Sequence, residues 1–300
     1  MKQTIMTASS VWLCLALVCL TACERNKVAA PPPGPAVRLA TDMTDNDKRA
    51  RLRTHYAGRA IEPALRTLPS GSFVIGCNQK SDCRFDEKPA VEITLKSFDL
   101  GKNEVTFEEW DACFADGGCT RLPFDQGWGR GWKPVINVSW IDVQQYIAWL
   151  NKRTGKAYRL PTEAEFEYAL RAGSSAPFWT GDCIDASQAN FDFSQPVEAC
   201  PQGIRVAAQP VFVTTYPPNR FGLHDMAGNV AEWTNDCWSY DYRGMRKDGT
   251  RSATGNCSHR VVRGGSWYDR ADFLRSASRD WFETDDRNDS LGFRLAHSRP

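Results

Sequence analysis

No cysteine follows Cys257, and the chain has only four histidines, which are scattered along it. No C-x2-C spacing occurs, so a zinc site of the finger or ribbon type is not expected. The formal net charge is +1, which gives no reason to expect a nucleic acid or a strongly charged partner. These absences exclude the commonest small metal-binding and nucleic-acid-binding classes.

Long hydrophobic runs are also lacking, except for one near the start of the chain. Residues 11–20 read VWLCLALVCL and follow the basic Lys2. This run is shorter than the roughly 20 apolar residues of a membrane-spanning helix, so it indicates a signal peptide over residues 1–22. The small residues directly before Cys23 resemble the bacterial lipobox, which implies that the Cys23 thiol carries a lipid after cleavage. An ordinary signal peptide with an incidental cysteine is the alternative.

The residue after the lipidated cysteine bears on location. It is Glu24 rather than Asp, so nothing indicates retention at an inner membrane. In a host with two membranes we expect the chain to be exported and anchored by its lipid to the outer membrane, facing the periplasm.

The cysteine count supports export to an oxidising compartment. Cys14 and Cys19 leave with the signal peptide and Cys23 takes the lipid, so eight of the eleven cysteines remain. An even remainder is typical of a disulfide-bonded protein. The eight fall into four couples of sequence neighbours, and we expect disulfides within these couples, although eight cysteines permit many other connectivities: Cys77 and Cys83, Cys113 and Cys119, Cys183 and Cys200, and Cys237 and Cys257.

The mature chain divides into a tether and a folded body. Residues 23–66 are predicted to be the tether, because residues 31–35 (PPPGP) favour extended polyproline II structure. Residues 42–53 within it are charged and predict a short helix with little apolar face. Residues 67–300 are predicted to form one domain. With 22 Gly and 17 Pro in the chain, we expect loops to predominate over long regular elements.

Helix caps and apolar periodicity place several elements in this domain. Three helices are predicted, after Thr106 with Glu109, from Ser139 to Gly155, and from Thr162 with Glu165 to a stop at Gly173. Short strands are predicted at residues 72–75, 91–95, 260–262 and 291–295. No convincing helix pattern follows residue 173. The pattern indicates an α+β domain with an irregular C-terminal half.

Six ordered sequence blocks then resemble a known family. They read GSFVIG (71–76) with KNEVT (102–106), PVINVSW (134–140), YRLPTEAEFE (158–167), NRFGLHDMAGNVAEW (219–233), VRGGSW (262–267) and GFR (292–294). In this order they resemble the formylglycine-generating enzyme, or sulfatase-modifying factor, family over about residues 67–298. The resemblance implies an unusual variant of the C-type lectin fold with little regular secondary structure.

The resemblance also implies a structural calcium site. Asp225, Gly228, Val230 and Glu232 match a family calcium site, and they offer carboxylate and carbonyl oxygens, the hard ligands that Ca²⁺ favours. The alternative is that Asp225 and Glu232 only cap their loop. Arg263 and Arg294 are expected to be buried guanidiniums that bond loop carbonyls. The RLPTEAE block is expected to be a strand-to-helix junction without chemistry.

The family's activity is not expected here. Active members oxidise a substrate cysteine with O₂ and a copper ion, which two cysteine thiolates hold shortly after the RGGS block. Residues 267–279 contain no cysteine, so we predict that copper and the formylglycine-generating activity are absent and assign no catalytic residue. This stretch carries four charged side chains, which could act as an acid–base or metal site but are expected to form ion pairs: Asp269, Arg270, Asp272 and Arg275.

Two functions from different classes remain open. The first is a non-catalytic binding, scaffold or regulatory lipoprotein of the cell envelope, for example in a secretion system, with an envelope protein as partner. The second is a periplasmic oxidoreductase of the same family with an altered mechanism. Four tryptophans are candidates for a partner-binding surface, although most of them can also be core residues: Trp128, Trp132, Trp238 and Trp281.

Overall fold

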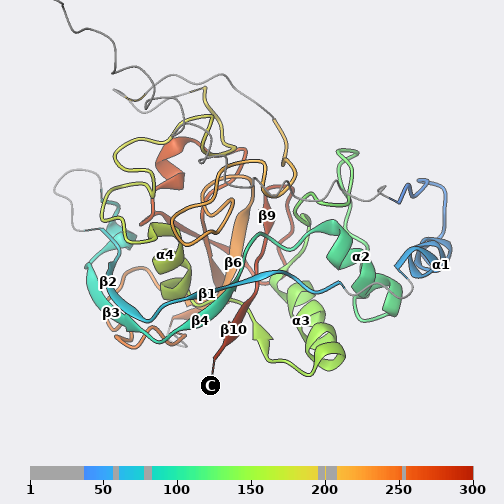
Figure 1. The fold of residues 1–300 in the computed structure, drawn as a ribbon, viewed down its shortest axis with the longest axis horizontal. Helices are drawn as coiled ribbons and strands as arrows, with labels where there is room; N and C mark the ends of the chain where they lie inside the picture. The colour runs from blue at the N-terminus through green and yellow to red at the C-terminus, as the bar shows by residue number, and fades with distance from the viewer. Residues whose placement is uncertain are drawn as a thin grey trace, which may run out of the picture. The chain divides into compact units, whose positions relative to one another are not determined.

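The computed structural model describes residues 37–56, 61–77, 83–194, 200, 208–251 and 255–299. The chain divides into two units, residues 1–32 and 33–300, and every described residue belongs to the second unit. The predicted signal peptide, Cys23 and the proline-rich run therefore lie outside the described residues. Figure 1 shows short strands, helices and long connecting loops, and these confirm the predicted α+β class.

Three helices begin where their capping residues predict. They are α2 (Phe107–Asp116), α3 (Trp140–Thr154) and α4 (Glu163–Arg171). Each follows a Thr or Ser whose side chain accepts the backbone N–H three residues on, while the acidic side chain there accepts the N–H of the cap residue. The predicted stop of α4 at Gly173 was wrong by one residue. Ala172 is its C-cap instead. The Ala172 N–H closes the last helical turn, and its φ of 44° is left-handed.

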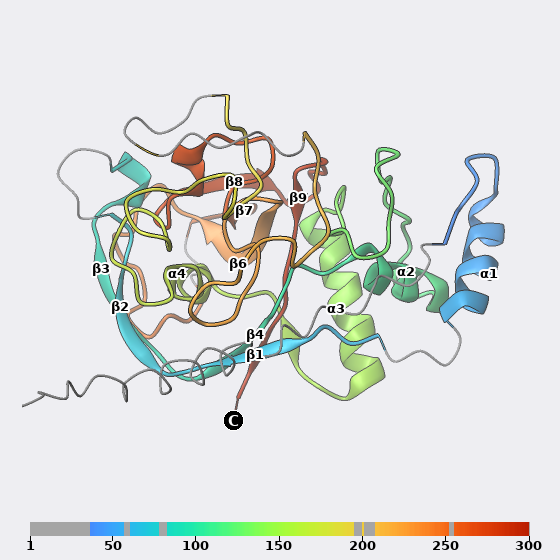
Figure 2. The same cartoon turned by 45° about the horizontal axis from the view of Figure 1, so that its top comes forward.

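The N-terminal helix belongs to the folded unit, which corrects the expected tether. α1 (Asp45–Tyr56) begins and ends later than predicted, and it buries Leu52 and Tyr56 against the core. Arg53 donates to the carbonyl of Ala115, at the end of α2, over 3.1 and 3.2 Å. Figures 1 and 2 both show α1 beside α2. The prediction of little apolar face is confirmed, since Leu52 and Tyr56 are the buried residues of the helix, but these two side chains one turn apart suffice to attach it.

The first sheet brings the two ends of the folded unit together. Its strand order is β1 (Leu65–Leu68), β4 (Phe98–Gly101), β10 (Ala296–Ser298) and β5 (Tyr158–Arg159). All its pairings are antiparallel. Because β1 begins before Thr67, the folded body starts earlier than the predicted domain boundary.

The remaining strands form a two-stranded ribbon and a second four-stranded sheet. The ribbon pairs β2 (Gly71–Ile75) with β3 (Val91–Leu95), and the sheet has the order β8 (Arg279–Glu283), β7 (Asn256–Arg263), β6 (Ala231–Trp238) and β9 (Leu291–Gly292). Two 3-10 helices occur at Phe85–Glu87 and Ala271–Leu274. After residue 173 the described ranges contain no α-helix, as predicted.

One predicted strand, residues 291–295, was too long. Only Leu291–Gly292 pairs with β6, in parallel. The chain then crosses toward the first sheet, where Leu295 accepts a hydrogen bond from the N–H of Gly101 at 2.7 Å. Arg294 meanwhile turns into the core, so this stretch links two sheets instead of extending one.

Aromatic side chains fill the core between α2 and α3. Trp110 is fully buried and stacks on Tyr146 with ring centroids 5.6 Å apart. Phe293 meets both rings edge-on, at 6.2 and 5.5 Å. These contacts attach the chain between β9 and β10 to α2 and α3.

Four disulfides join sequence neighbours, as predicted. They are Cys77–Cys83, Cys113–Cys119, Cys183–Cys200 and Cys237–Cys257. Such cross-links stabilise the fold mainly by restricting the unfolded chain, which suits a domain rich in loops. Within the described ranges, no helix combines the length and apolar character needed to cross a membrane.

The docking of α1 can be tested with Leu52→Ala. Leu52 is fully buried, so its truncation should lower the free energy of unfolding by about 2–5 kcal/mol, measured by urea denaturation. Arg51→Ala changes an exposed neighbour on the same helix and should leave the urea midpoint nearly unchanged. Equal midpoints for both variants would show that α1 does not pack on the domain.

Candidate functional site

The segment after Gly264-Gly265 is where the family resemblance places a copper site. Both glycines have positive φ, of 93° and 68°, and a Cβ on Gly265 would lie 2.8 Å from Leu274. Ser266 donates from its N–H and its Oγ to Oδ2 of Asp269, at 2.9 and 2.7 Å. Burial raises the pKa of the Asp269 carboxyl, and the two hydrogen bonds from Ser266 oppose that rise. Asp269 thus closes a tight turn with one of its carboxyl oxygens.

The other charged residues of this segment point to different places. Arg270 and Asp272 form an exposed ion pair at 3.1 Å. Arg275 instead binds both carboxylate oxygens of the buried Glu87, at 2.6 and 2.9 Å. The prediction of ion pairs is confirmed for Arg270, Asp272 and Arg275, whereas Asp269 bonds Ser266 instead. The segment does not assemble an acid–base pair.

Aromatic side chains gather beside this turn. The rings of Trp128 and Trp267 meet edge-on with centroids 5.4 Å apart, and Tyr268 lies 5.5 Å from Trp267. Tyr268 is 71% exposed, whereas Trp267 is buried and donates its indole N–H to the carbonyl of Asp289 at 3.1 Å. We refer to Trp128, Trp267 and Tyr268 as the aromatic surface.

The four tryptophans predicted as a partner surface lie in three different surroundings. Trp128 belongs to the aromatic surface, while Trp132 donates its indole N–H to Glu108 at 2.8 Å. Trp238 is buried, and its ring centroid is 6.3 Å from that of the half-exposed Trp281. They therefore do not form one continuous surface.

A buried network of arginines and carboxylates lies behind the segment. Both oxygens of Glu163, on α4, accept hydrogen bonds from Arg279 at 2.8 Å. Arg263 lies 3.6 Å from Glu163 and forms an ion pair with Glu167, one turn further along α4. We call these four residues the α4 network. Burial alone would lower the pKa of Arg279, but the Glu163 carboxylate raises it above its ordinary value.

The α4 network also holds irregular backbone in place. Arg263 donates to the carbonyl of Ser276 at 2.9 Å, and Arg279 donates to the carbonyls of Asp86 and Ser239 at 2.9 Å each. The prediction that Arg263 bonds loop carbonyls is confirmed. The RLPTEAE block is a helix junction, as expected. Its Glu163, together with Glu167 just after the block, also provides the counter-charges for Arg263 and Arg279, which the sequence pattern did not indicate.

A second buried cluster contains two of the predicted calcium ligands. Both oxygens of Glu232 accept hydrogen bonds from Arg294, over 2.7 to 3.0 Å. Arg294 also donates to the carbonyls of Gly101 and His224, at 3.1 and 3.0 Å, as expected for a buried guanidinium. Asp225 accepts the N–H of Thr214 at 3.0 Å.

The charges of this cluster are unbalanced, because three carboxyl groups face one arginine. Burial raises the pKa of Asp225 to about 6 and that of Glu104 well above its ordinary value. The pKa of Glu232 is raised by burial and lowered by Arg294, with a net rise. Oε2 of Glu104 is buried and has no hydrogen-bond partner. We call Glu104, Asp225, Glu232 and Arg294 the acidic cluster.

Gly228 and Val230 belong to the same loop as the acidic cluster. Gly228 has a φ of 81°, and a Cβ there would lie 2.4 Å from the carbonyl oxygen of Asn190, so glycine is required. Between Gly228 and Val230, the fully buried Asn229 donates to Glu104 at 3.0 Å and accepts the N–H of Val211 at 2.9 Å. Neither Glu104 nor Asn229 was predicted to have a role. Both lie in sequence blocks that resemble the family, KNEVT and NRFGLHDMAGNVAEW, and that resemblance could have indicated them.

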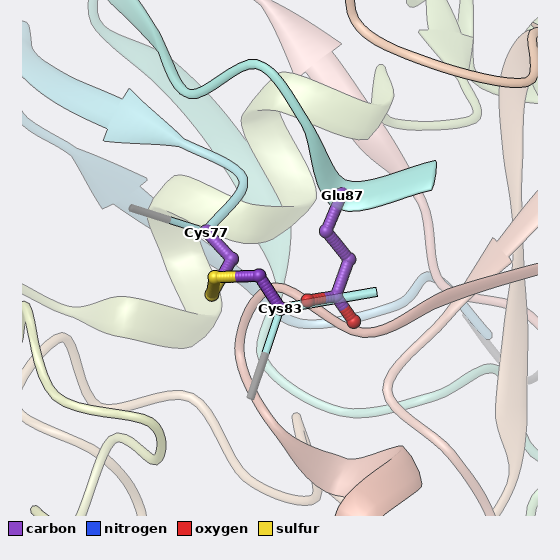
Figure 3. Close-up of side chains that lie close together, drawn as sticks. All are labelled: Cys77, Cys83 and Glu87. Atoms are coloured by element: carbon purple, nitrogen blue, oxygen red, sulfur yellow. A yellow bond between two sulfur atoms is a disulfide. The ribbon is translucent and has the colours of Figure 1, made fainter. Parts of the chain in front are cut away.

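Close groups of metal-binding side chains are few in the described ranges. Cys77, Cys83 and Glu87 form one (Figure 3), with the two sulfurs bonded to each other. Glu87 also pairs with Arg275. Glu283, Asp285 and Asp286 form the other, on the surface. The three carboxyl groups of the acidic cluster do not converge within 4.8 Å. No thiolate pair for copper is present among the described cysteines, since all eight are disulfide-bonded.

The α4 network can be tested with Arg263→Met, which retains bulk but removes the buried charge. Glu167 would lose one partner where no water replaces it, so the free energy of unfolding should fall by about 3–5 kcal/mol in urea denaturation. Arg246→Gln breaks the exposed ion pair with Asp248 and should leave the midpoint unchanged. An unchanged midpoint for Arg263→Met would contradict a structural role for the network.

Comparison with known proteins agrees with this geometry. The sulfatase-modifying factor enzyme 1-like domain model matches residues 55–299. The inactive C-alpha-formylglycine-generating enzyme 2 of Bos taurus is 32% identical over 295 residues, covering 76% of this chain and 86% of that protein. The formylglycine-generating enzyme of Streptomyces coelicolor is 33% identical over 177 residues, covering 56% and 54%.

Other relatives are larger proteins. The serine/threonine-protein kinase pkn1 of Chlamydia pneumoniae is 32% identical over 235 residues, which are 70% of this chain but only 34% of the kinase. The chain thus spans about a third of the length of that relative.

Among solved structures, PvdO from Pseudomonas aeruginosa superposes with a TM-score of 0.67 and 32% identity, covering 90% of this chain and all of PvdO. Treponema denticola variable protein 1 has a TM-score of 0.63 at 23% identity over 80% of this chain and 98% of that one, which shows a shared fold alone. The chain belongs to the sulfatase-modifying factor enzyme 1-like domain family and has the formylglycine-generating-enzyme-like fold.

Proposed function

We propose that this chain is a lipid-anchored envelope protein whose domain binds a partner and does not oxidise cysteine. One observation carries the proposal. The segment after Gly264-Gly265 has no cysteine, and the eight cysteines after Cys23 are all in disulfides. Copper in this family requires a pair of thiolates, and a disulfide does not supply the anionic sulfur that Cu(I) prefers.

The names of two relatives support a non-catalytic role. The matching proteins of Mus musculus and Bos taurus are both named inactive C-alpha-formylglycine-generating enzyme 2. An anchored domain of this kind fits a scaffold or regulatory component, for example of a secretion system. The lipid on Cys23 would hold the domain at the outer membrane, facing the periplasm, and its partner would be another envelope protein.

The aromatic surface is the part of the domain that we assign to partner binding. It lies where active members of the family carry out their chemistry, and it presents the exposed Tyr268 ring over the buried Trp267. Tyr and Trp bury a large area on binding with little loss of side-chain freedom, and they dominate many protein interfaces. Arg270 and Asp272, which follow Tyr268 closely in the chain, form an exposed ion pair that would serve as part of a polar rim.

The proposal predicts no oxidase turnover and a partner whose binding depends on Tyr268. The full chain should neither consume O₂ with a cysteine-containing sulfatase peptide nor convert that cysteine. Crosslinking in the envelope, followed by mass spectrometry, would identify the partner. Tyr268→Ala should then weaken its binding at least about tenfold. Tyr240→Ala is the matched control, since Tyr240 is 76% exposed elsewhere on the domain and its loss should have no effect.

Peptide oxidation that disappears in Asp269→Ala would contradict this proposal. It would favour the alternative, a periplasmic oxidoreductase with an altered mechanism. Equal binding of the partner by the Tyr268→Ala and Tyr240→Ala variants would show that the aromatic surface is not the interface.

We further propose that the acidic cluster binds Ca²⁺ as a structural ion. Its three carboxyl groups outnumber its one guanidinium, and Oε2 of Glu104 lacks a partner, which supports a cation at the two ligand carboxylates although the three carboxyl groups do not converge within 4.8 Å. Asp225 and Glu232 would be the carboxylate ligands, and the carbonyls of Gly228 and Val230 would complete the set. Oxygen ligands of this kind suit Ca²⁺, and the ion would offset the repulsion between the buried carboxylates.

Calcium should therefore raise the melting temperature of the full chain, measured by circular dichroism in CaCl₂ against EDTA. At a calcium concentration 100 times Kd, binding adds about 2.7 kcal/mol to the free energy of unfolding. Asp225→Asn should abolish the shift, whereas Asp285→Asn, in the surface group of acids, should retain it. Identical melting in CaCl₂ and EDTA would refute the calcium site.

A further inference from the structure

One edge of the β2–β3 ribbon carries backbone groups without partners. Thr94 on β3 donates its N–H to the carbonyl of Lys247 at 2.8 Å, on the side away from β2. Ser72 lies directly opposite Thr94, so these two residues form a non-hydrogen-bonded pair. The N–H and C=O groups of Ser72, and of Val74 two residues on, therefore point away from β3. We call these four groups the outer edge of β2.

Further along the same side of β2 the backbone is fully bonded. The N–H of Gly76 donates to Glu167 at 2.9 Å, and its C=O accepts from Arg171 at 2.9 Å. Both partners come from α4, which lies beside the ribbon in Figures 1 and 2. The described residues supply no such partner at Ser72 or Val74, and Val74 is 43% exposed. Unpaired donors and acceptors on a strand edge are a template for another strand.

A pocket of about 390 Å³ opens beside the outer edge. Ser72, Phe73 and Val74 contribute one wall, and residues 173–177 contribute another. Tyr168 and Phe221 also line it, and the Tyr168 ring centroid is 5.4 Å from those of both Phe73 and Phe221. Three adjoining aromatic rings make this part of the pocket suitable for an apolar side chain.

Both arginines that line the pocket are already bonded to buried carboxylates, although Glu167 is shared with Arg263. Arg171 bonds Glu167 at 2.9 Å, and Arg275 bonds both oxygens of the buried Glu87. An anionic ligand would have to compete with these carboxylates for the guanidiniums. The pocket therefore favours an uncharged occupant.

We propose that the outer edge of β2 and this pocket bind an extended, uncharged peptide segment of a partner protein. The peptide backbone would pair with Ser72 and Val74 as an added strand, while one large apolar side chain enters the pocket. Main-chain hydrogen bonds give affinity in such complexes, and a side-chain pocket gives specificity. The site uses no residue of the aromatic surface, so a test of this proposal is independent of a test of the proposed function.

The test uses the full chain and a capped, fluorescent heptapeptide of alternating Thr and Ser with a central Leu. Fluorescence polarisation should show saturable binding, and the amides of Ser72 and Val74 should exchange their hydrogens more slowly in the complex. N-methylation of the central peptide amides removes their donors and should abolish binding. Val74→Pro removes one donor of the outer edge but no β2–β3 hydrogen bond, and should weaken binding about tenfold.

Two further variants make the result decisive. Glu92 lies directly opposite Val74 in the ribbon, so Glu92→Pro alters the other edge and should leave binding unchanged. Ser175→Trp places a large ring in the pocket from an exposed position, and should abolish binding even if Val74→Pro fails to fold. The proposal is overturned if the folded wild-type chain does not bind the peptide, or if Ser175→Trp binds it as well as wild type.

Discussion

Arg263 is fully buried between Glu163 and Glu167 of α4, and Arg279 binds the same Glu163 from the next strand. Charges removed from water must be paired almost completely, so these contacts allow little variation in the positions of the segments that carry them. Through carbonyls such as that of Ser276, the arginines also hold loops that no sheet or helix would otherwise fix. The domain thus uses buried ion pairs where other folds use regular backbone hydrogen bonding.

The acidic cluster also buries charged side chains, but its carboxyl groups outnumber its guanidinium. In the α4 network, Glu163 and Glu167 meet Arg263 and Arg279, and Arg171 adds a further guanidinium at Glu167, so both carboxylates are paired. In the acidic cluster three carboxyl groups meet one arginine, and burial raises their pKa values. Proton uptake or a bound cation can relieve that excess, and the α4 network has no such excess of carboxyl groups.

The turn after Gly264-Gly265 is built without a cysteine. Gly264-Gly265 still makes a tight turn, and Ser266 and Asp269 close it by hydrogen bonds. None of this requires a thiolate, because the α4 network supports the turn from behind. The fold at this position therefore does not depend on a cysteine, and it leaves the Tyr268 ring exposed.

Much of the fold was determined by local sequence. The caps at Thr106, Ser139 and Thr162 placed three helices, and cysteine spacing gave the four disulfides, because both depend on residues close together in the chain. Tertiary structure decided what depends on distant partners, such as the pairing of Glu163 with Arg279 or of Glu104 with Asn229. A buried carboxylate is specified by the side chain that neutralises it, and that side chain can lie a hundred residues away.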